Sequence, residues 1–169
     1  MAQNSIDIVF PVLNEENRLP CGIDATIHFL EQHQEFDYLL TIADNGSTDA
    51  TEEVAKELMN RYSGKIRYLK VGKKGVGLAL RTAWTTSNKD IVGYMDVDLA
   101  TDISHLLDVY RLFAQTNVDI VNGSRLLKGA CVKKRSLLRE VASRSLNLIV
   151  PVLLQTKFTD AMCGFKFLR

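Results

Sequence analysis

The chain alternates short β-prone apolar runs with amphipathic helical stretches, and this order constrains its fold more than any other feature. Runs rich in Val, Ile, Leu and Tyr predict strands at residues 6–12, 38–43, 66–71, 91–95 and 119–122. Between them, apolar residues recur at helical spacing, as in Ile23, Ile27 and Leu30. Strands that alternate with helices favour an α/β fold with a mostly parallel sheet flanked by helices.

The composition is that of a globular protein rather than a membrane-spanning or disulfide-stabilised one. The 169 residues are 46% hydrophobic and 24% charged, which suits one domain with a sizeable core. The cysteines, Cys21, Cys131 and Cys163, are odd in number and show no metal or redox spacing. No apolar run approaches the roughly 20 residues that a membrane span needs. We therefore expect a cytoplasmic protein with, at most, peripheral contact with the membrane.

Polar side chains follow the predicted strands at the points where the strands end. They are Asn14 and Glu15 after the first, Asp44 and Asn45 after the second, Asp96 and Asp98 after the fourth, and Arg125 after the fifth. In an open parallel sheet, ligands bind beyond the carboxyl ends of the strands. These groups are therefore predicted to converge on one edge of the sheet.

Asp96 and Asp98 form the sharpest local signal. They close the apolar run at residues 91–95 and are two positions apart, so on an extended backbone they point the same way. Paired carboxylates of this kind suit Mg²⁺ or Mn²⁺ held against a diphosphate. Taken alone, the pair would more often be two turn-capping acids, but the rest of the chain favours the metal.

Two further segments point to phosphate groups. Gly75 and Gly77 permit a close backbone approach, and Lys73 and Lys74 beside them can reach a phosphate; two solvated lysines next to a helix-opening turn are the open alternative. From residue 125 to 144 the chain is basic with one acid, Glu140, which indicates an anionic partner. The apolar helical stretch at 137–154 fits either a lipid surface or a core helix kinked at proline.

Several motifs together resemble family 2 glycosyltransferases. Residues 11–15 (Pro-Val-Leu-Asn-Glu) resemble the family's opening motif, 42–49 (Ile-Ala-Asp-Asn-Gly-Ser-Thr-Asp) its base-reading loop, and 96–98 its metal motif. Residues 123–125 and 160–165 also match in order, and the best match is the branch that makes dolichyl- or polyprenyl-phosphate mannose or glucose. The resemblance implies a GT-A fold and a nucleotide-sugar donor, GDP-mannose or UDP-glucose.

The resemblance also implies roles for individual residues. The nucleoside pocket would be lined by Pro11, Leu13, Asn14, Glu15, Asp44 and Asn45, with Lys74 and Gly75 nearby and Asp96 and Asp98 at the metal and diphosphate. Arg125 and Arg139 would hold the donor diphosphate and the phosphate of a polyprenyl-phosphate acceptor, by bidentate contacts that suit arginine. Two positions depart from the family pattern: Leu13, where an aromatic residue is common, and Asn45, where the family has a second Asp.

We expect residues 1–169 to be a single GT-A catalytic domain, truncated at its C-terminal end, with no nucleic-acid partner. The main alternative is a family 2 enzyme acting on a polysaccharide or small hydroxyl acceptor, for which Asp160 is the candidate base. A sugar nucleotidyltransferase would need a glycine-rich basic loop after the first strand, and residues 11–20 have none. A phosphoacceptor receiver would need an acidic pair there, and this chain has Asn14 and Glu15.

Overall fold

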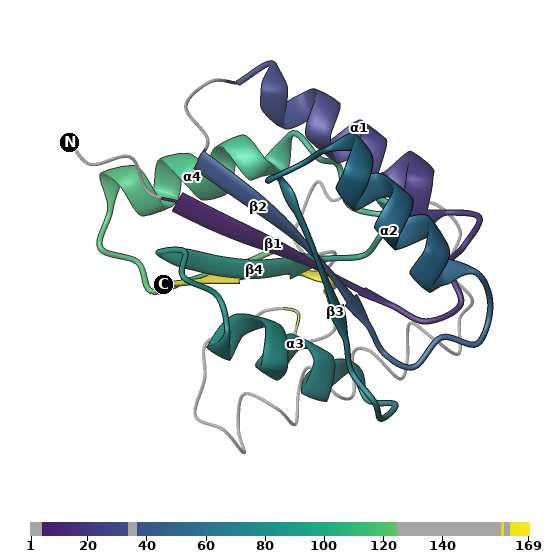
Figure 1. The fold of residues 1–169 in the computed structure, drawn as a ribbon. Helices are drawn as coiled ribbons and strands as arrows, with labels where there is room; N and C mark the ends of the chain where they lie inside the picture. Colours follow the sequence, from purple (N-terminus) through teal and green to yellow (C-terminus); the bar gives the residue numbers. More distant parts are fainter. Residues whose placement is uncertain (1–4, 34–36, 125–159, 161–162) are drawn as a thin grey trace, which may run out of the picture.

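The computed structural model describes residues 5–33, 37–124, 160 and 163–169 (Figure 1). The described strands are β1 (Ser5–Val12), β2 (Asp37–Asp44), β3 (Ile66–Lys70), β4 (Ile91–Met95), β5 (Ile120–Asn122) and β6 (Phe165–Leu168). The described helices are α1 (Leu19–Glu31), α2 (Thr51–Arg61), α3 (Val76–Thr85) and α4 (His105–Gln115). The five strands predicted from the sequence are confirmed to within one residue at each end.

The described strands form one sheet in the order β3-β2-β1-β4-β6-β5. β1 pairs in parallel with β2 and β4, and β2 pairs in parallel with β3. β6, which the sequence pattern did not predict, is antiparallel to both of its neighbours, β4 and β5. The sheet is therefore mostly parallel, as predicted, with one reversed strand near its edge.

Helices cover both faces of the sheet (Figure 1). On one face α1, α2 and α4 pack on the alternate side chains of β1, Ile6, Ile8 and Phe10, to form the larger core. On the other face Ala79 and Ala83 of α3 pack in a smaller cluster with Val9 and other strand residues. The predicted helical stripe Ile23, Ile27 and Leu30 is fully buried, which confirms the helical periodicity of that segment.

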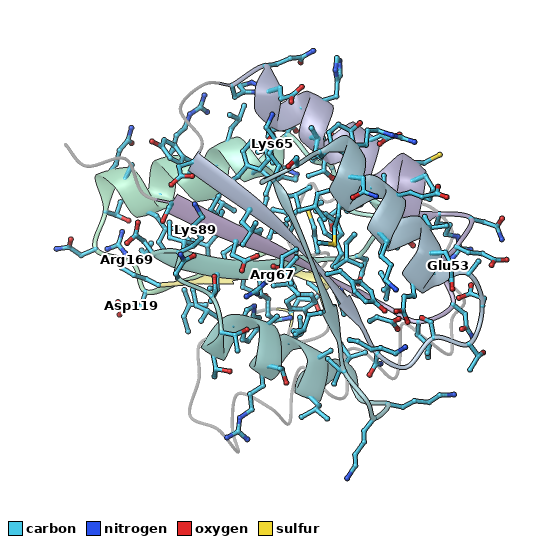
Figure 2. All side chains as sticks on the ribbon, viewed as in Figure 1. Glu53, Lys65, Arg67, Lys89, Asp119 and Arg169 are labelled. Carbon is cyan, nitrogen blue, oxygen red and sulfur yellow. The ribbon has the colours of Figure 1, made fainter. Side chains whose placement is uncertain are left out.

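A polar cluster lies between the sheet and α3, in the half of the strands away from their carboxyl ends. Asp7 of β1 is fully buried and accepts hydrogen bonds from the hydroxyl of Thr41 (2.7 Å) and from Arg67 (3.2 Å). Arg67 also donates to the carbonyls of Ala83 and Thr86, which ties the end of α3 to the sheet (Figure 2). Burial raises the pKa of Asp7, and the neighbouring hydroxyls and Arg67 only partly offset that rise.

Candidate active site

The carboxyl ends of β1 and β2 and the start of β3's exit loop meet at one edge of the sheet. The backbone N–H of Asn45 donates to the carbonyl of Val12 (2.9 Å), and that of Val71 donates to the carbonyl of Asp44 (2.8 Å). These bonds continue the sheet register past the strand ends. The predicted convergence of the residues after the first and second strands is therefore confirmed.

The loop after β1 and the loop after β2 are joined by side-chain hydrogen bonds. Asn14, whose φ of 57° is left-handed, accepts from the backbone N–H of Thr48 through Oδ1 (2.8 Å). Its own N–H donates to Oγ of Ser47 (2.9 Å), and the N–H of Glu15 donates to Oγ1 of Thr51 (2.9 Å). Asparagine tolerates the left-handed region better than most residues, which suits position 14 to this connection. The two predicted pocket residues, Asn14 and Glu15, are thus held against the second loop.

Glu16 extends the same connection to the start of α2. Its carboxylate accepts from the N–H of Ala50 (2.8 Å), and its N–H donates to the carboxylate of Asp49 (3.2 Å). Asp49 also accepts from the N–H and hydroxyl of Thr51, the first residue of α2. Two carboxylates therefore satisfy N–H groups at this helix N-terminus, where negative charge is favourable. Glu16 makes this contact from the loop after β1, and the sequence analysis did not identify it.

Asp44 shapes the loop after β2 from within. It is 1% exposed, and its Oδ1 accepts from the backbone N–H groups of Gly46 (3.1 Å) and Ser47 (2.8 Å). The hydroxyl of Tyr68 on β3 donates to its Oδ2 (2.7 Å). Burial, together with the Asp44 carboxylate, raises the pKa of Tyr68, so this hydroxyl remains a donor at neutral pH. The Asp44 carboxylate thus accepts three hydrogen bonds from other groups of the protein. Tyr68 helps to hold this carboxylate in place, and the sequence analysis did not identify it.

Asn45 connects this loop to the glycine turn before α3. Its side chain accepts from the backbone N–H of Gly75 through Oδ1 (2.6 Å), although the two residues are 30 positions apart. The stem of Lys74 lies beside the same loop, since a Cβ added at Gly46 would be 3.8 Å from Lys74 Cγ. Three predicted binding residues, Asn45, Lys74 and Gly75, are therefore brought together.

Asp96 and Asp98 follow β4 on an exposed turn. Both are exposed, while Val97 between them is buried and faces the core. The N–H of Ala100 donates to Oδ1 of Asp98 (3.0 Å), and Oδ2 of Asp98 has no partner among the described residues. The predicted shared orientation of the two carboxylates agrees with this alternation of exposed, buried and exposed side chains.

Two glycines allow this turn to sit where it does. A Cβ at Gly22 of α1 would lie 2.3 Å from the carbonyl oxygen of Val97, and a Cβ at Gly164 would lie 2.0 Å from Oδ2 of Asp96. Both distances are far below contact. At Gly22 the obstacle is the backbone of Val97, which cannot rotate away, whereas at Gly164 an added Cβ would have to displace the Asp96 carboxylate. Gly22 could have been noticed as a lone glycine inside a helical pattern, which often marks close packing.

The two carboxylates fit a divalent cation that takes its other ligands from a substrate. Within the described ranges, no group of three His, Cys, Asp or Glu side chains gathers into a metal cage. Mg²⁺ is commonly bound by one or two carboxylates together with substrate phosphates and water, and Mn²⁺ accepts the same oxygen ligands. Asp96 and Asp98 are the residues that would hold such an ion.

Of the remaining predicted residues, some lie within the part of the chain that the structure describes and others lie outside it. Pro11, the last residue but one of β1, is half-buried, and Leu13, just past the strand, is 38% exposed. Asp160 is fully buried, and its backbone carbonyl accepts from Nδ2 of Asn122 (3.0 Å) at the end of β5. Arg125 and Arg139 lie outside the described residues, as does the segment 137–154. No helix formed by the described residues is long and apolar enough to cross a membrane.

Comparison with known proteins identifies the family. The model of the family described as glycosyl transferase family 2 matches residues 7–169. This chain belongs to glycosyl transferase family 2. The resemblance drawn from the motifs is therefore confirmed.

Curated relatives of this family 2 chain include dolichyl-phosphate β-glucosyltransferases. It is 30% identical over 162 residues to the glycosyltransferase AglD of Haloferax volcanii, covering 95% of this chain and 26% of that protein. It is 30% identical to a dolichyl-phosphate β-glucosyltransferase of Dictyostelium discoideum and 31% identical to the human one, covering 95% of this chain and 53% of each. The chain thus spans between about a quarter and a half of the relatives it matches.

Solved structures share the fold of this family 2 chain. The glucosyl-3-phosphoglycerate synthase of Mycobacterium tuberculosis, in complex with Mn²⁺, UDP and glucosyl-3-phosphoglycerate, has a TM-score of 0.67 at 20% identity, covering 98% of this chain and 56% of that one. The mannosyltransferase PcManGT of Pyrobaculum calidifontis, in complex with GDP-mannose and Mn²⁺, has a TM-score of 0.63 at 19% identity, covering 85% and 39%. These likenesses confirm the predicted GT-A fold.

Proposed function

We propose that this chain carries the donor site of an inverting, metal-dependent glycosyltransferase that moves a hexose from a nucleotide-sugar, GDP-mannose or UDP-glucose, to a polyprenyl or dolichyl phosphate. The observation that carries the proposal is the pair of exposed carboxylates, Asp96 and Asp98, on the sheet edge where the loops holding Asn14 and Asn45 converge. Family membership and the Mn²⁺ and nucleotide named for the structural neighbours support a donor of this class.

The donor would bind with its diphosphate at the turn after β4. A divalent ion bound there would neutralise the charge that develops on the leaving diphosphate. Asp96 and Asp98 would hold that ion, and Lys74, exposed beside the loop after β2, would add a positive charge near the phosphates. The nucleoside would lie against Leu13 and the loop at residues 44–46, whose shape Asp44 maintains through its internal hydrogen bonds.

The acceptor is proposed to be a lipid phosphate. A phosphate of this kind is already ionised near neutral pH, so it attacks the anomeric carbon without a strong general base, and catalysis rests on positioning and on the leaving group. The names of the dolichyl-phosphate relatives support this acceptor. Arg125 and Arg139 are proposed to hold the donor diphosphate and the acceptor phosphate, and the basic segment 125–144 is proposed to contact the membrane surface.

The test is calorimetric titration of UDP and GDP into the protein with Mn²⁺ and, separately, with EDTA. We expect binding to depend on the ion and Asp98→Ala to weaken it at least tenfold, about 1.4 kcal/mol. Asp108→Ala is the matched control, because Asp108 is an exposed acid on α4 that pairs only with His105 and Arg111 among the described residues. Equal affinity with Mn²⁺ and with EDTA would refute a metal-dependent donor site.

The acceptor is tested by transfer of labelled hexose to polyprenyl phosphate in detergent micelles. Transfer to this lipid, and none to a soluble alcohol, would support the proposal. Transfer to the alcohol alone would indicate a hydroxyl acceptor instead, and would direct attention to Asp160 as a base.

A further inference from the structure

The ammonium group of Lys166 on β6 is bonded to the main chain of its own segment. Lys166 is half-buried and lies opposite Tyr94 of β4 in the antiparallel register, with Nζ 5.5 Å from the centre of the tyrosine ring. Nζ donates to the backbone carbonyl of Cys163 (2.5 Å) and to the hydroxyl of Tyr94 (3.3 Å). Fixing a lysine in this way costs side-chain entropy that a lysine facing solvent would keep.

The carbonyl of Cys163 is held by two donors. Besides the ammonium of Lys166, it accepts from the hydroxyl of Tyr94 (3.2 Å), and that hydroxyl itself accepts from Lys166. The three groups form a closed triangle of hydrogen bonds, and the charge of the ammonium strengthens the two that it donates. Because the peptide bond is planar, fixing this carbonyl also fixes the peptide plane that continues into Gly164.

Gly164 brings this fixed peptide to Asp96. A Cβ added at Gly164 would be 2.0 Å from Oδ2 of Asp96 and 2.5 Å from its Cγ, so the main chain at Gly164 lies directly against the carboxylate. Tyr94 is two positions before Asp96, so the end of β4 supplies both one donor of the triangle and the carboxylate. A continuous series of contacts therefore runs from Lys166, through the fixed peptide, to the side chain of Asp96.

We propose that Lys166 is a positioning residue for the divalent ion. Through the carbonyl of Cys163 it holds the main chain against which the Asp96 carboxylate packs, and so sets where that carboxylate meets the ion. This inference rests on the proposed function, since it assumes that Asp96 binds a divalent ion together with a donor diphosphate. Residues that orient metal ligands typically change metal affinity roughly 10–100-fold when they are replaced.

A purely structural role, in which Lys166 only joins β6 to β4, is the rival explanation. The two explanations differ in what they predict for the folded protein. Loss of a connection between strands lowers the melting temperature and leaves the metal requirement of nucleotide binding unchanged. Loss of a positioning contact raises the Mn²⁺ concentration that binding needs, and excess Mn²⁺ then restores the affinity for the nucleotide.

The test measures the Mn²⁺ concentration that gives half-maximal binding of UDP or GDP, by calorimetry at a series of Mn²⁺ concentrations. Lys166→Met keeps most of the unbranched side chain and removes the donor, and we expect this concentration to rise about tenfold. Lys166→Arg keeps a cationic donor and should recover most of the change. Lys89→Met is the matched control and should leave the concentration unchanged, because Lys89 is also half-buried but lies before the other end of β4, where it pairs with Asp37.

Tyr94→Phe is a second variant, which decides the question if Lys166→Met does not fold. It keeps the ring and removes one of the two donors to Cys163, so the half-maximal Mn²⁺ concentration should rise about threefold. An unchanged concentration in either folded variant, or a loss of affinity that excess Mn²⁺ does not restore, would overturn the inference and leave the proposed function standing. A wild type that binds neither UDP nor GDP, or binds them equally with Mn²⁺ and with EDTA, would overturn both.

Discussion

Replacing Gly22 with alanine should disturb the turn that carries Asp96 and Asp98. Gly22 lies in the first half of α1, and its Cα packs directly against the backbone of Val97, between the two acidic residues. An added Cβ would be 2.3 Å from the carbonyl oxygen of Val97 and 2.9 Å from its Cγ2. Since the closest atom is backbone, no side-chain rotation relieves the clash, and either α1 or the turn must move.

The size of the effect follows from two opposing contributions. Overpacking a core contact costs about 1–3 kcal/mol, and a backbone clash at this distance belongs at the upper end. Alanine also favours a helix over glycine by roughly 1 kcal/mol, which offsets part of that cost. The net loss of stability is then about 2 kcal/mol, which lowers Tm by roughly 4–8 °C in a chain of this size.

Thermal unfolding and Mn²⁺-dependent binding of UDP or GDP measure the two consequences. We expect Gly22→Ala to melt below the wild type and to bind the nucleotide about 3–10-fold more weakly, because a displaced Val97 moves both carboxylates. Gly77→Ala is the control for stability, since a Cβ there meets no atom within 4 Å and lies in another helix. A Gly22→Ala protein that melts as the wild type does and binds equally well would refute the proposed link between α1 and the turn.

Two further substitutions test a contact at the start of α2 and a buried carboxylate in the sheet. Glu16→Ala should lower the free energy of unfolding by about 0.5–2 kcal/mol, because Glu16 satisfies the N–H of Ala50 at the start of α2. Urea denaturation measures this loss, and Glu16→Gln should recover most of it. Burial raises the pKa of Asp7 above 3.8, so the folded state binds this proton more tightly and stability falls as pH rises through the raised pKa. Asparagine does not titrate, so the free energy of unfolding of Asp7→Asn relative to the wild type should increase with pH across that window. A difference that stays constant with pH would contradict a raised pKa for Asp7.

The alternation of strands and helices was readable in the sequence because buried parallel strands are continuous apolar runs bounded by polar turns. The same rule placed Asn14, Asp44 and Asn45 together, since adjacent parallel strands end at one edge. Their individual roles were not readable. Asp44 and Asn45 are neighbours in sequence, but the Asp44 carboxylate accepts from its own loop and from Tyr68, whereas the Asn45 side chain accepts from Gly75, 30 positions away.

The reversed strand β6 and the glycine contacts could not have been predicted from local pattern. β6 is four residues long, and its place between β4 and β5 depends on pairing with residues more than 40 positions away. A Cβ at Gly93 would lie 2.0 Å from the ring of Phe167, so the glycine in β4 makes room for the phenylalanine of β6. Such close approaches are set by tertiary packing, which a glycine in a strand hints at but does not specify.

The same packing fixes the turn after β4 that carries the carboxylates of Asp96 and Asp98. Gly22 and Gly93 each leave room for a neighbouring group that an added Cβ would clash with, and together they place β4 and its turn between α1 and β6. Gly164 lies against the carboxylate of Asp96. Val97 anchors the turn in the core, and the side chains of Asp96 and Asp98 on either side of it are exposed. If this turn binds an ion as proposed, the diphosphate of the donor would complete the coordination, and metal binding would be coupled to substrate binding. The affinity for Mn²⁺ alone should therefore be weak, and it should rise when the nucleoside diphosphate is present.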